Sequence, residues 1–257
     1  MSFTQFLTVT SLQNNQTKYF VLSHDWKEKR EQLFVFIRDI PELIKQMDQI
    51  SSQSFSDNPR VEIYDSTFRL RVSSACESAA HCLYSMAEIS AQFANKATKG
   101  DFPSSFNDIV KKLEKSWNPH NIKDILGDFH WYKKIREMRT EWTHYSTIFI
   151  AGDVGNHTIV LKRHRRESDQ QEFKENNIKI QINDFLLWLN KAIEVLDSFS
   201  LFLSKEYLLK TFDLDQVIIV PKRDSRGFPI FLSGPTPRVE TENITIGDYF
   251  RRAGIKL

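Results

Sequence analysis

Apolar side chains recur at alternating steps of three and four residues through several long stretches of the chain. This spacing places them on one face of an α-helix, so each stretch is expected to form an amphipathic helix. The second of them carries small residues at its middle, which let a neighbouring helix approach closely. A shorter helix ending near Lys115 is expected, with Ser104 or Ser105 as its N-cap. The predicted long helices cover residues 26–50, 68–93, 121–145 and 184–210.

Prolines and short polar side chains mark the expected helix ends. Pro41 is expected to bend or restart the first helix, because proline removes a backbone donor. Residues 51–58 are polar and precede a proline, which indicates a loop. Asn118 and Pro119 read as a cap and a first-turn proline for the third long helix. Asn183 or Asp184 is expected to cap the last one.

The period of the pattern changes near residue 146. Residues 147–150 and 157–162 flank a glycine-containing segment, which predicts a β-hairpin, and residues 177–182 alternate as a third strand would. A short strand is expected at 217–220, and the tail from 221 is rich in Pro, Gly and Arg, as in an extended arm. The fold class expected is therefore mainly α, in a single domain over residues 1–257. It has a helical core (26–210), a small β insert (146–182) and a C-terminal arm (211–257).

Composition narrows the functional classes. The formal charge is +2, from 35 basic and 33 acidic residues, so any binding to phosphate must come from a local patch. Cys76 and Cys82 lie six apart on different faces of one predicted helix, so no disulfide is expected and a reducing compartment is indicated. The sequence has neither a signal-peptide pattern nor a membrane-spanning apolar run, which favours a cytoplasmic protein without a membrane partner.

Familiar catalytic motifs are missing from the sequence. It has no phosphate-binding loop, no Gly-x-Ser-x-Gly turn, no His-Glu-x-x-His helix and no cysteines at metal spacing, so neither a cofactor nor a metal is expected. The polar face of the 121–145 helix remains. There Arg136, Arg139 and Thr143 share one azimuth with Thr140 and His144 beside them, next to the buried stripe. A rim position of this kind suits a ligand site, since packing fixes the helix.

The run from Arg139 to His144 resembles the Arg-x(4–6)-His motif of the HEPN superfamily of helical nucleic-acid-acting proteins. That family places the motif on a later helix of an antiparallel helical bundle, and here one long helix precedes it and another follows. The resemblance covers residues 26–210 architecturally and leaves out the C-terminal arm. Family members often have a polar residue such as Asn after the arginine, where this chain has Thr140.

The resemblance implies metal-independent RNA cleavage of toxin or defence type, in which the ribose 2′-hydroxyl attacks the adjacent phosphorus. His144 would move the proton and Arg139 would hold the phosphate oxygens, with Arg136, Thr140 and Thr143 contacting substrate. Five residues at about 100° each place Arg139 and His144 about 140° apart around a helix. We therefore expect a homodimer that pairs two motifs, as family members commonly do. A cognate antitoxin or another protein is an expected partner besides RNA.

Two further clusters have competing interpretations. Glu77 and His81, one turn apart, either support the motif or form a simple surface pair. The basic run that contains Arg163, Arg165 and Arg166 either guides RNA phosphates or is a hydrated loop. The competing interpretation of the whole chain is a non-catalytic helical module that binds a nucleotide, RNA or a protein. In that case His144 is a residue that caps its helix.

Overall fold

The computed structural model describes residues 17–51, 59–144, 146–151, 155–163, 178–208, 210, 212–234 and 238–252. The chain divides into two compact units, one formed by His24–Phe199 and the other by Met1–Ser23 with Ser200–Leu257. Most described residues are helical, as the apolar spacing predicts. None of the helices in these ranges is both long and apolar enough to cross a lipid bilayer.

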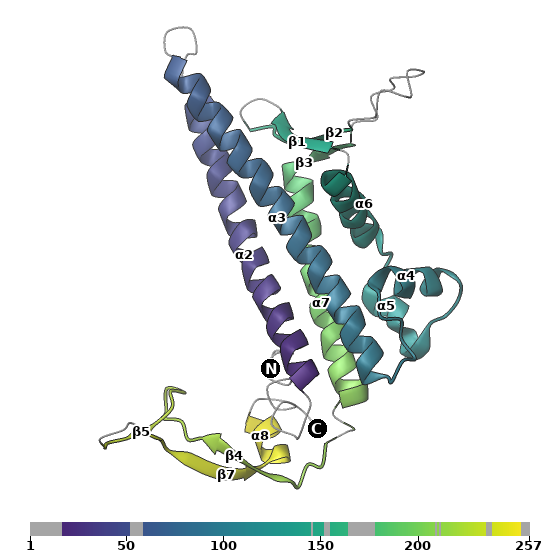
Figure 1. The fold of residues 1–257 in the computed structure, drawn as a ribbon, viewed down its shortest axis with the longest axis vertical. Helices are drawn as coiled ribbons and strands as arrows, with labels where there is room; N and C mark the ends of the chain where they lie inside the picture. The colour runs from purple at the N-terminus through teal and green to yellow at the C-terminus, as the bar shows by residue number, and fades with distance from the viewer. Residues whose placement is uncertain are drawn as a thin grey trace. The chain divides into compact units, whose positions relative to one another are not determined.

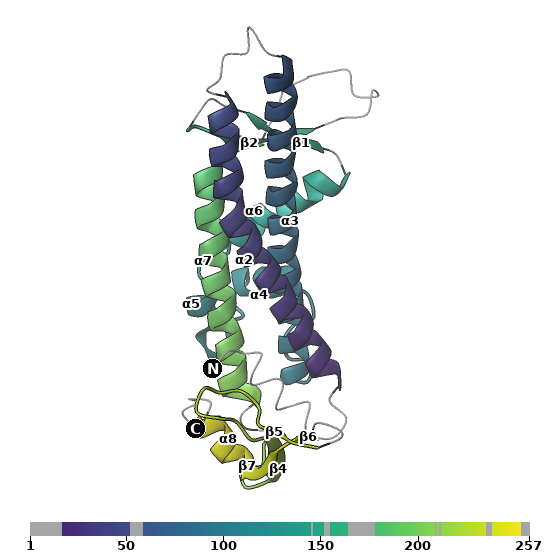
Figure 2. The same cartoon turned by 90° about the vertical axis from the view of Figure 1, so that its left-hand side faces the viewer.

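Helices α2 (Thr17–Ser51) and α3 (Pro59–Ala97) run antiparallel. Trp26 Nε1 donates a hydrogen bond of 3.0 Å to Ser90 Oγ, and the Cys82 thiol lies 3.6 Å from Gln32 Oε1. Residue numbers therefore rise along α2 as they fall along α3. Figures 1 and 2 show the two helices side by side. Both predicted helices are confirmed.

Pro41 does not restart the first helix, because α2 continues through it. A proline inside a helix loses one backbone hydrogen bond. Ile40 and Met47 are fully buried on either side of it, so packing offsets that loss. On α3, the predicted small-residue face is also present, since Ala75 and Ala79 are buried.

Helix α7 (Ile182–Leu203) runs beside α2 and α3 in both views (Figures 1 and 2). Arg30 of α2 grips Asp197 of α7 through two hydrogen bonds, Nε to Oδ1 at 3.0 Å and Nη2 to Oδ2 at 2.6 Å. The prediction that Asn183 or Asp184 caps α7 is wrong. The helix already begins at Ile182, whose N–H donates to the carbonyl of His157.

The predicted 121–145 helix is broken into two. A single 3-10 turn (Pro119–Asn121) leads into α5 (Ile122–Leu126), and α6 spans His130–His144. Gly127 and Phe129, which lie between α5 and α6, have φ values of 70° and 58°. An α-helix does not allow positive φ values of this kind. Asp128 Oδ1 then accepts the N–H of His130 and starts α6. The Gly-Asp pair was the sequence signal for this break.

Helix α4 (Phe106–Glu114) precedes this region, with Ser105 at its N-cap position. The Ser105 side chain makes no capping hydrogen bond. Instead, the N–H of Phe106 donates to Glu88 Oε2 of α3 at 3.4 Å. Capping by a side chain from another helix ties the start of α4 to α3.

The predicted hairpin and third strand are confirmed as an antiparallel sheet in the order β1-β2-β3. Its strands are β1 (Ser146–Ala151), β2 (Thr158–Arg163) and β3 (Ile178–Gln181). Ile150, Ile159 and Ile180, one from each strand, are buried. Arg69 of α3 donates to the Ile150 carbonyl at 3.0 Å, which fixes β1 against the N-terminal half of α3.

The second unit shows that the tail is more than an extended arm. The predicted strand is present as β4 (Val217–Pro221), and it pairs with β7 (Thr241–Thr245). Alternate β4 residues are buried, which explains why the ladder forms. A single turn of π-helix follows α7 directly. The remaining elements are that turn (Ser204–Leu208), β5 (Phe231–Leu232) paired with β6 (Arg238–Val239), and α8 (Ile246–Arg252).

Candidate functional site

Helix α6 carries the Arg–His motif and packs along α3. Its buried face consists of Trp131, Tyr132, Ile135 and Met138. The Tyr132 hydroxyl contacts α3 at Glu88, and seven residues later Arg139 contacts it at Tyr84. Residue numbers rise on α6 as they fall on α3, so the two helices are antiparallel. The C-terminal end of α6, at His144, therefore lies toward the N-terminal half of α3.

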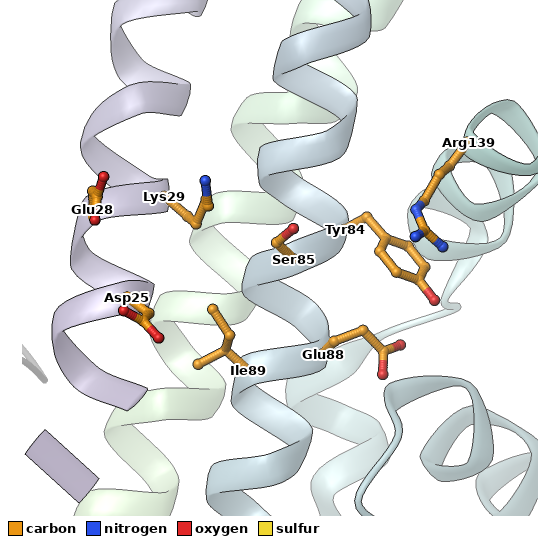
Figure 3. Close-up of a pocket in the computed structure, with 8 residues that line it drawn as sticks. All are labelled: Asp25, Glu28, Lys29, Tyr84, Ser85, Glu88, Ile89 and Arg139. Carbon is orange, nitrogen blue, oxygen red and sulfur yellow. The ribbon is translucent and has the colours of Figure 1, made fainter. Parts of the chain in front are cut away.

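A hollow of about 360 Å³ lies beside this contact and contains Arg139. It is walled by α2, α3 and α6 (Figure 3). Two of its residues are cationic and three carry carboxylates, so its net charge is slightly negative. The lining residues are Asp25, Glu28 and Lys29 of α2, Tyr84, Ser85, Glu88 and Ile89 of α3, and Arg139 of α6.

Arg139 is held in place by an aromatic ring. Its guanidinium carbon lies 4.3 Å from the centre of the Tyr84 ring, within the range of a cation–π interaction. The residue is half-buried, at the border between the packed and the exposed faces of α6. This is the rim position that the sequence predicts for it. A guanidinium fixed in this way is set in a direction before any ligand arrives.

Glu88 is fixed by two donors from different helices. Its Oε1 accepts the Tyr132 hydroxyl at 2.9 Å, and its Oε2 accepts the N–H of Phe106 at 3.4 Å. Burial, the Glu88 carboxylate and Tyr84 together raise the pKa of Tyr132 far above its usual range. Tyr132 therefore stays protonated and remains a donor. Its ring also stacks on that of Tyr84, at 6.1 Å between centroids and 15° between planes.

The arrangement offers an anion-binding group beside a structural carboxylate. Arg139 can hold phosphate or carboxylate oxygens, whereas both oxygens of Glu88 accept hydrogen bonds from within the protein. Neither Tyr84 nor Glu88 was predicted from the sequence. Both continue the Glu77–His81 row at steps of three and four, so the row itself was the signal that could have found them.

The predicted supporting pair lies on that same row. His81 Nε2 and Glu77 Oε1 are 3.8 Å apart, and both side chains are roughly 40% exposed. An ion pair of this exposure adds little to stability. Because α6 runs antiparallel to α3, the stretch of α3 that bears the pair faces the end of α6. The fold therefore brings the pair to the region of the motif, on the helix surface.

Among the described residues of α6, the other predicted site residues do not line the hollow that contains Arg139. Arg136 and Thr140 are exposed, and the Thr140 hydroxyl donates to the Arg136 carbonyl at 2.9 Å. That bond uses the hydroxyl proton of Thr140 within the helix. The hydroxyl can then contact a substrate only as an acceptor, unless the bond breaks. Thr143 and His144 belong to the last turn of α6, and their side chains lie outside the described part.

The basic run begins at the end of β2. Arg163 is the final residue of that strand and pairs with Ser146, two residues after His144. Paired strand residues lie about 5 Å apart at Cα, so the start of the run is beside the end of α6. Arg165 and Arg166 lie outside the described residues, as does the Arg163 side chain.

No protein-family model, curated protein or solved structure matches this chain. The resemblance to the HEPN superfamily therefore rests on the residues from Arg139 to His144 and on the order of helices expected from the sequence.

Two other groups of side chains could carry chemistry, one on α2 and one on α3. His24, Asp25 and Glu28 bring an imidazole and two carboxylates within 4.8 Å of one another. All three side chains are exposed on α2, so water would surround most of any ion bound there. We assign no metal to them. Cys76 and Cys82 are buried free thiols, as expected, and burial raises the pKa of Cys76 to about 12.

Proposed function

We propose that this chain is a HEPN-like endoribonuclease that cleaves RNA without a metal, with Arg139 and His144 as its catalytic pair. The placement of Arg139 carries the proposal. Its guanidinium is fixed over Tyr84 at the open edge of a hollow, in the helix that ends at His144. Such a group can bind a phosphate through its planar fork of donors.

The surroundings of the motif support the same proposal. Helix α6 lies antiparallel to the long helix α3 that precedes it, and an antiparallel bundle with the motif on a later helix is what the proposal expects. The pairing of Arg163 with Ser146 brings the basic run to the end of α6, where it can attract the RNA backbone. Arg136, exposed on α6, lies one turn from Arg139 and can assist it.

The chemistry is an internal transfer of the phosphodiester. The 2′-oxygen forms a bond to phosphorus while the bond from phosphorus to the 5′-oxygen breaks. The 2′-hydroxyl proton goes to the imidazole of His144, and the departing 5′-oxygen takes a proton from water. Arg139 stabilises the charge on the phosphate oxygens, a contribution worth on the order of 10²–10³ in rate. The products are a 2′,3′-cyclic phosphate and a 5′-hydroxyl.

A homodimer joins the two groups at one phosphate in this proposal. Arg139 and His144 are five residues apart, which gives about 140° of rotation and about 7.5 Å of rise on one helix. A single α6 thus presents them to different sides. A two-fold axis near the end of α6 lets Arg139 of one protomer meet His144 of the other.

The direct test is cleavage of RNA by the purified chain in excess EDTA. We expect wild-type cleavage to persist in chelator and to fall at least 100-fold in Arg139→Ala and His144→Gln. Matched controls are Arg38→Ala, an exposed arginine on α2, and His130→Gln, an exposed histidine at the other end of α6. Both should cleave like wild type. Equal activity of Arg139→Ala, His144→Gln and wild type would end the assignment.

Mixing the two inactive variants tests the dimer. If each site takes Arg139 from one protomer and His144 from the other, a mixed dimer has one intact site of two. Random exchange then restores about a quarter of wild-type activity. No recovery after subunit exchange would place both groups within one protomer.

The acidic wall of the hollow favours one second candidate, a non-catalytic module that binds a basic protein segment. Asp25, Glu28 and Glu88 supply three carboxylates against two cations. An oligolysine peptide titrated into the chain is the probe. Binding that disappears in Asp25→Asn/Glu28→Gln, together with no cleavage of RNA, would favour this module over the nuclease.

A further inference from the structure

A second hollow, of about 320 Å³, lies at the C-terminal half of α4. Three of its five lining residues are lysines, and one is an aspartate. It therefore carries a net positive charge, unlike the hollow that holds Arg139. The lining consists of Pro103, Asp108, Lys111, Lys112 and Lys115.

Two of the three lysines keep their charge available. Lys111 has Asp108 as a partner, with 3.5 Å between Nζ and Oδ1. Within the described ranges, neither Lys112 nor Lys115 pairs with a carboxylate. All three lysines are exposed, so their ammonium groups can reach an external anion.

Lys112 is positioned by the way α4 ends. The Trp117 N–H donates to the Lys112 carbonyl at 3.1 Å, and Ser116 between them has a φ of 76°. This is the Schellman ending of a helix, which brings the residue after the turn back onto the last helical turn. It places the Trp117 ring under Lys112, with Nζ 5.2 Å from the ring centre. The left-handed conformation of Ser116 costs free energy, and the hydrogen bond from the Trp117 N–H to the Lys112 carbonyl helps to offset that cost.

Trp117 is itself anchored from below. Its ring packs edge-on against Phe102, which is 1% exposed, at 5.1 Å between centroids. The ammonium group of Lys112 therefore rests on a fixed aromatic ring, and a group held in this way loses little conformational entropy on binding.

The two hollows are joined by α4. Phe106, its first residue, donates its N–H to Glu88 of the Arg139 hollow. From Phe106 to Lys115 the axial distance is about 14 Å, at about 1.5 Å per residue. In a helical strand the phosphates are spaced by about 3.4 Å along the axis, so about four of them cover this length. The start of α4 therefore contacts a residue that lines the Arg139 hollow, and the end of α4 bears the lysines, a length of about four phosphates away.

We infer that the Lys111–Lys112–Lys115 hollow is a binding site for the phosphate backbone of single-stranded RNA, a few nucleotides from the position held by Arg139. The inference rests on the proposed function and deepens it, because it adds a contact to the substrate outside the catalytic pair. Lysine contacts of this kind act as point charges and read no base. The site sets affinity and register, with no sequence preference of its own.

The test uses the full chain and an RNA that cannot be cleaved, a 2′-O-methyl oligouridylate of 12 nucleotides with a fluorescent label. Binding is followed by anisotropy over a range of salt concentrations. The test variant is Lys111→Gln/Lys112→Gln/Lys115→Gln. A control with the same change in charge is Lys45→Gln/Lys179→Gln/Lys191→Gln, three exposed lysines that line neither hollow.

Each phosphate contact adds about 0.7 to the slope of log K against log salt for a single strand, so the test variant should lose about 2 from that slope. Its affinity near 0.15 M salt should fall on the order of 10- to 100-fold, and the control should bind like wild type.

An unchanged slope in the test variant, or an equal loss in the control, overturns the inference even if the chain cleaves RNA. Inorganic polyphosphate that binds as tightly as the RNA and with the same loss also overturns it, because the hollow would then be a general anion patch. A slope change without any cleavage of natural RNA by the wild type keeps the binding site and removes the proposed nuclease.

Discussion

The Tyr132 hydroxyl donates to the Glu88 carboxylate at 2.9 Å across 44 residues of sequence. This bond joins α6 to α3. On α3 it lies one helical turn from the contact between Arg139 and Tyr84. Glu88 also accepts the first N–H of α4, so three helices meet at one carboxylate. The position of Arg139 depends on this junction.

Tyr132→Phe should lower the free energy of unfolding by about 1.5–3 kcal/mol, because a hydrogen bond to a charged group is lost while the carboxylate stays half-buried. Urea denaturation measures the difference. Tyr64→Phe, on α3 and away from this junction in sequence, serves as the control for loss of a phenol. Equal stabilities of Tyr132→Phe and wild type would mean that the bond contributes nothing net.

The raised pKa of Tyr132 predicts a particular response to alkali. The folded chain keeps this proton above its ordinary pKa of 10.0, whereas the unfolded chain releases it. The free energy of unfolding is therefore unaffected by this group below about pH 10 and falls as the pH rises above it. In a spectrophotometric titration near 295 nm, one phenol fewer should ionise reversibly than in the unfolded chain. In Tyr132→Phe that difference should disappear.

Tyr84 is a positioning residue for Arg139, and an aromatic series tests it. Tyr84→Leu removes the π face and should lower kcat for RNA cleavage about 10-fold, in line with a cation–π contribution of about 0.5–2 kcal/mol. Tyr84→Phe keeps the face and should restore most of the activity. Loss of activity in both variants alike would assign the effect to the hydroxyl rather than to the ring.

His157 fastens the sheet to α2. Its Nε2 lies 2.5 Å from Asp48 Oδ1, and its side chain is 3% exposed. Its Nδ1 is buried without a hydrogen-bond partner among the described atoms. His157→Ala should lower the free energy of unfolding by about 1–3 kcal/mol, from the lost bond and the space left behind. Thermal unfolding checks this, and His24→Ala, at an exposed histidine within helix α2, should change stability by less.

Ser116→Gly should stabilise the chain by about 1 kcal/mol, because glycine adopts the left-handed conformation at the end of α4 without strain. Ser105→Gly is the matched control, since its φ of −116° favours no glycine. It should be neutral or slightly destabilising. Stabilisation of the same size in both variants would contradict the strain at Ser116.

The spacing of apolar residues predicted the long helices and the β insert well. Residues on one face of a helix recur every three or four positions, whatever that face packs against. The apolar stripes of α2, α3 and α7 could therefore be predicted from the local sequence. The same rule failed at Gly127–Phe129. There the apolar spacing continues across the break, and the positive φ angles end the helix although Phe129 remains buried.

The candidate site was only partly within reach of the sequence. Arg139 could be proposed from its place beside the buried stripe. Tyr84 and Glu88 could not, because their role depends on which face of α3 meets α6. The same is true of Trp117, whose position beneath Lys112 follows from the conformation of one serine.

By itself, the sequence determined which segments are helical, which side of each helix is apolar and where the Arg–His motif lies, because those properties follow from local spacing and side-chain chemistry. Only the tertiary structure decided that Arg139 rests on Tyr84, that Glu88 joins three helices and that the lysines of α4 surround one hollow. These relations depend on packing between segments far apart in the chain, which no local pattern encodes.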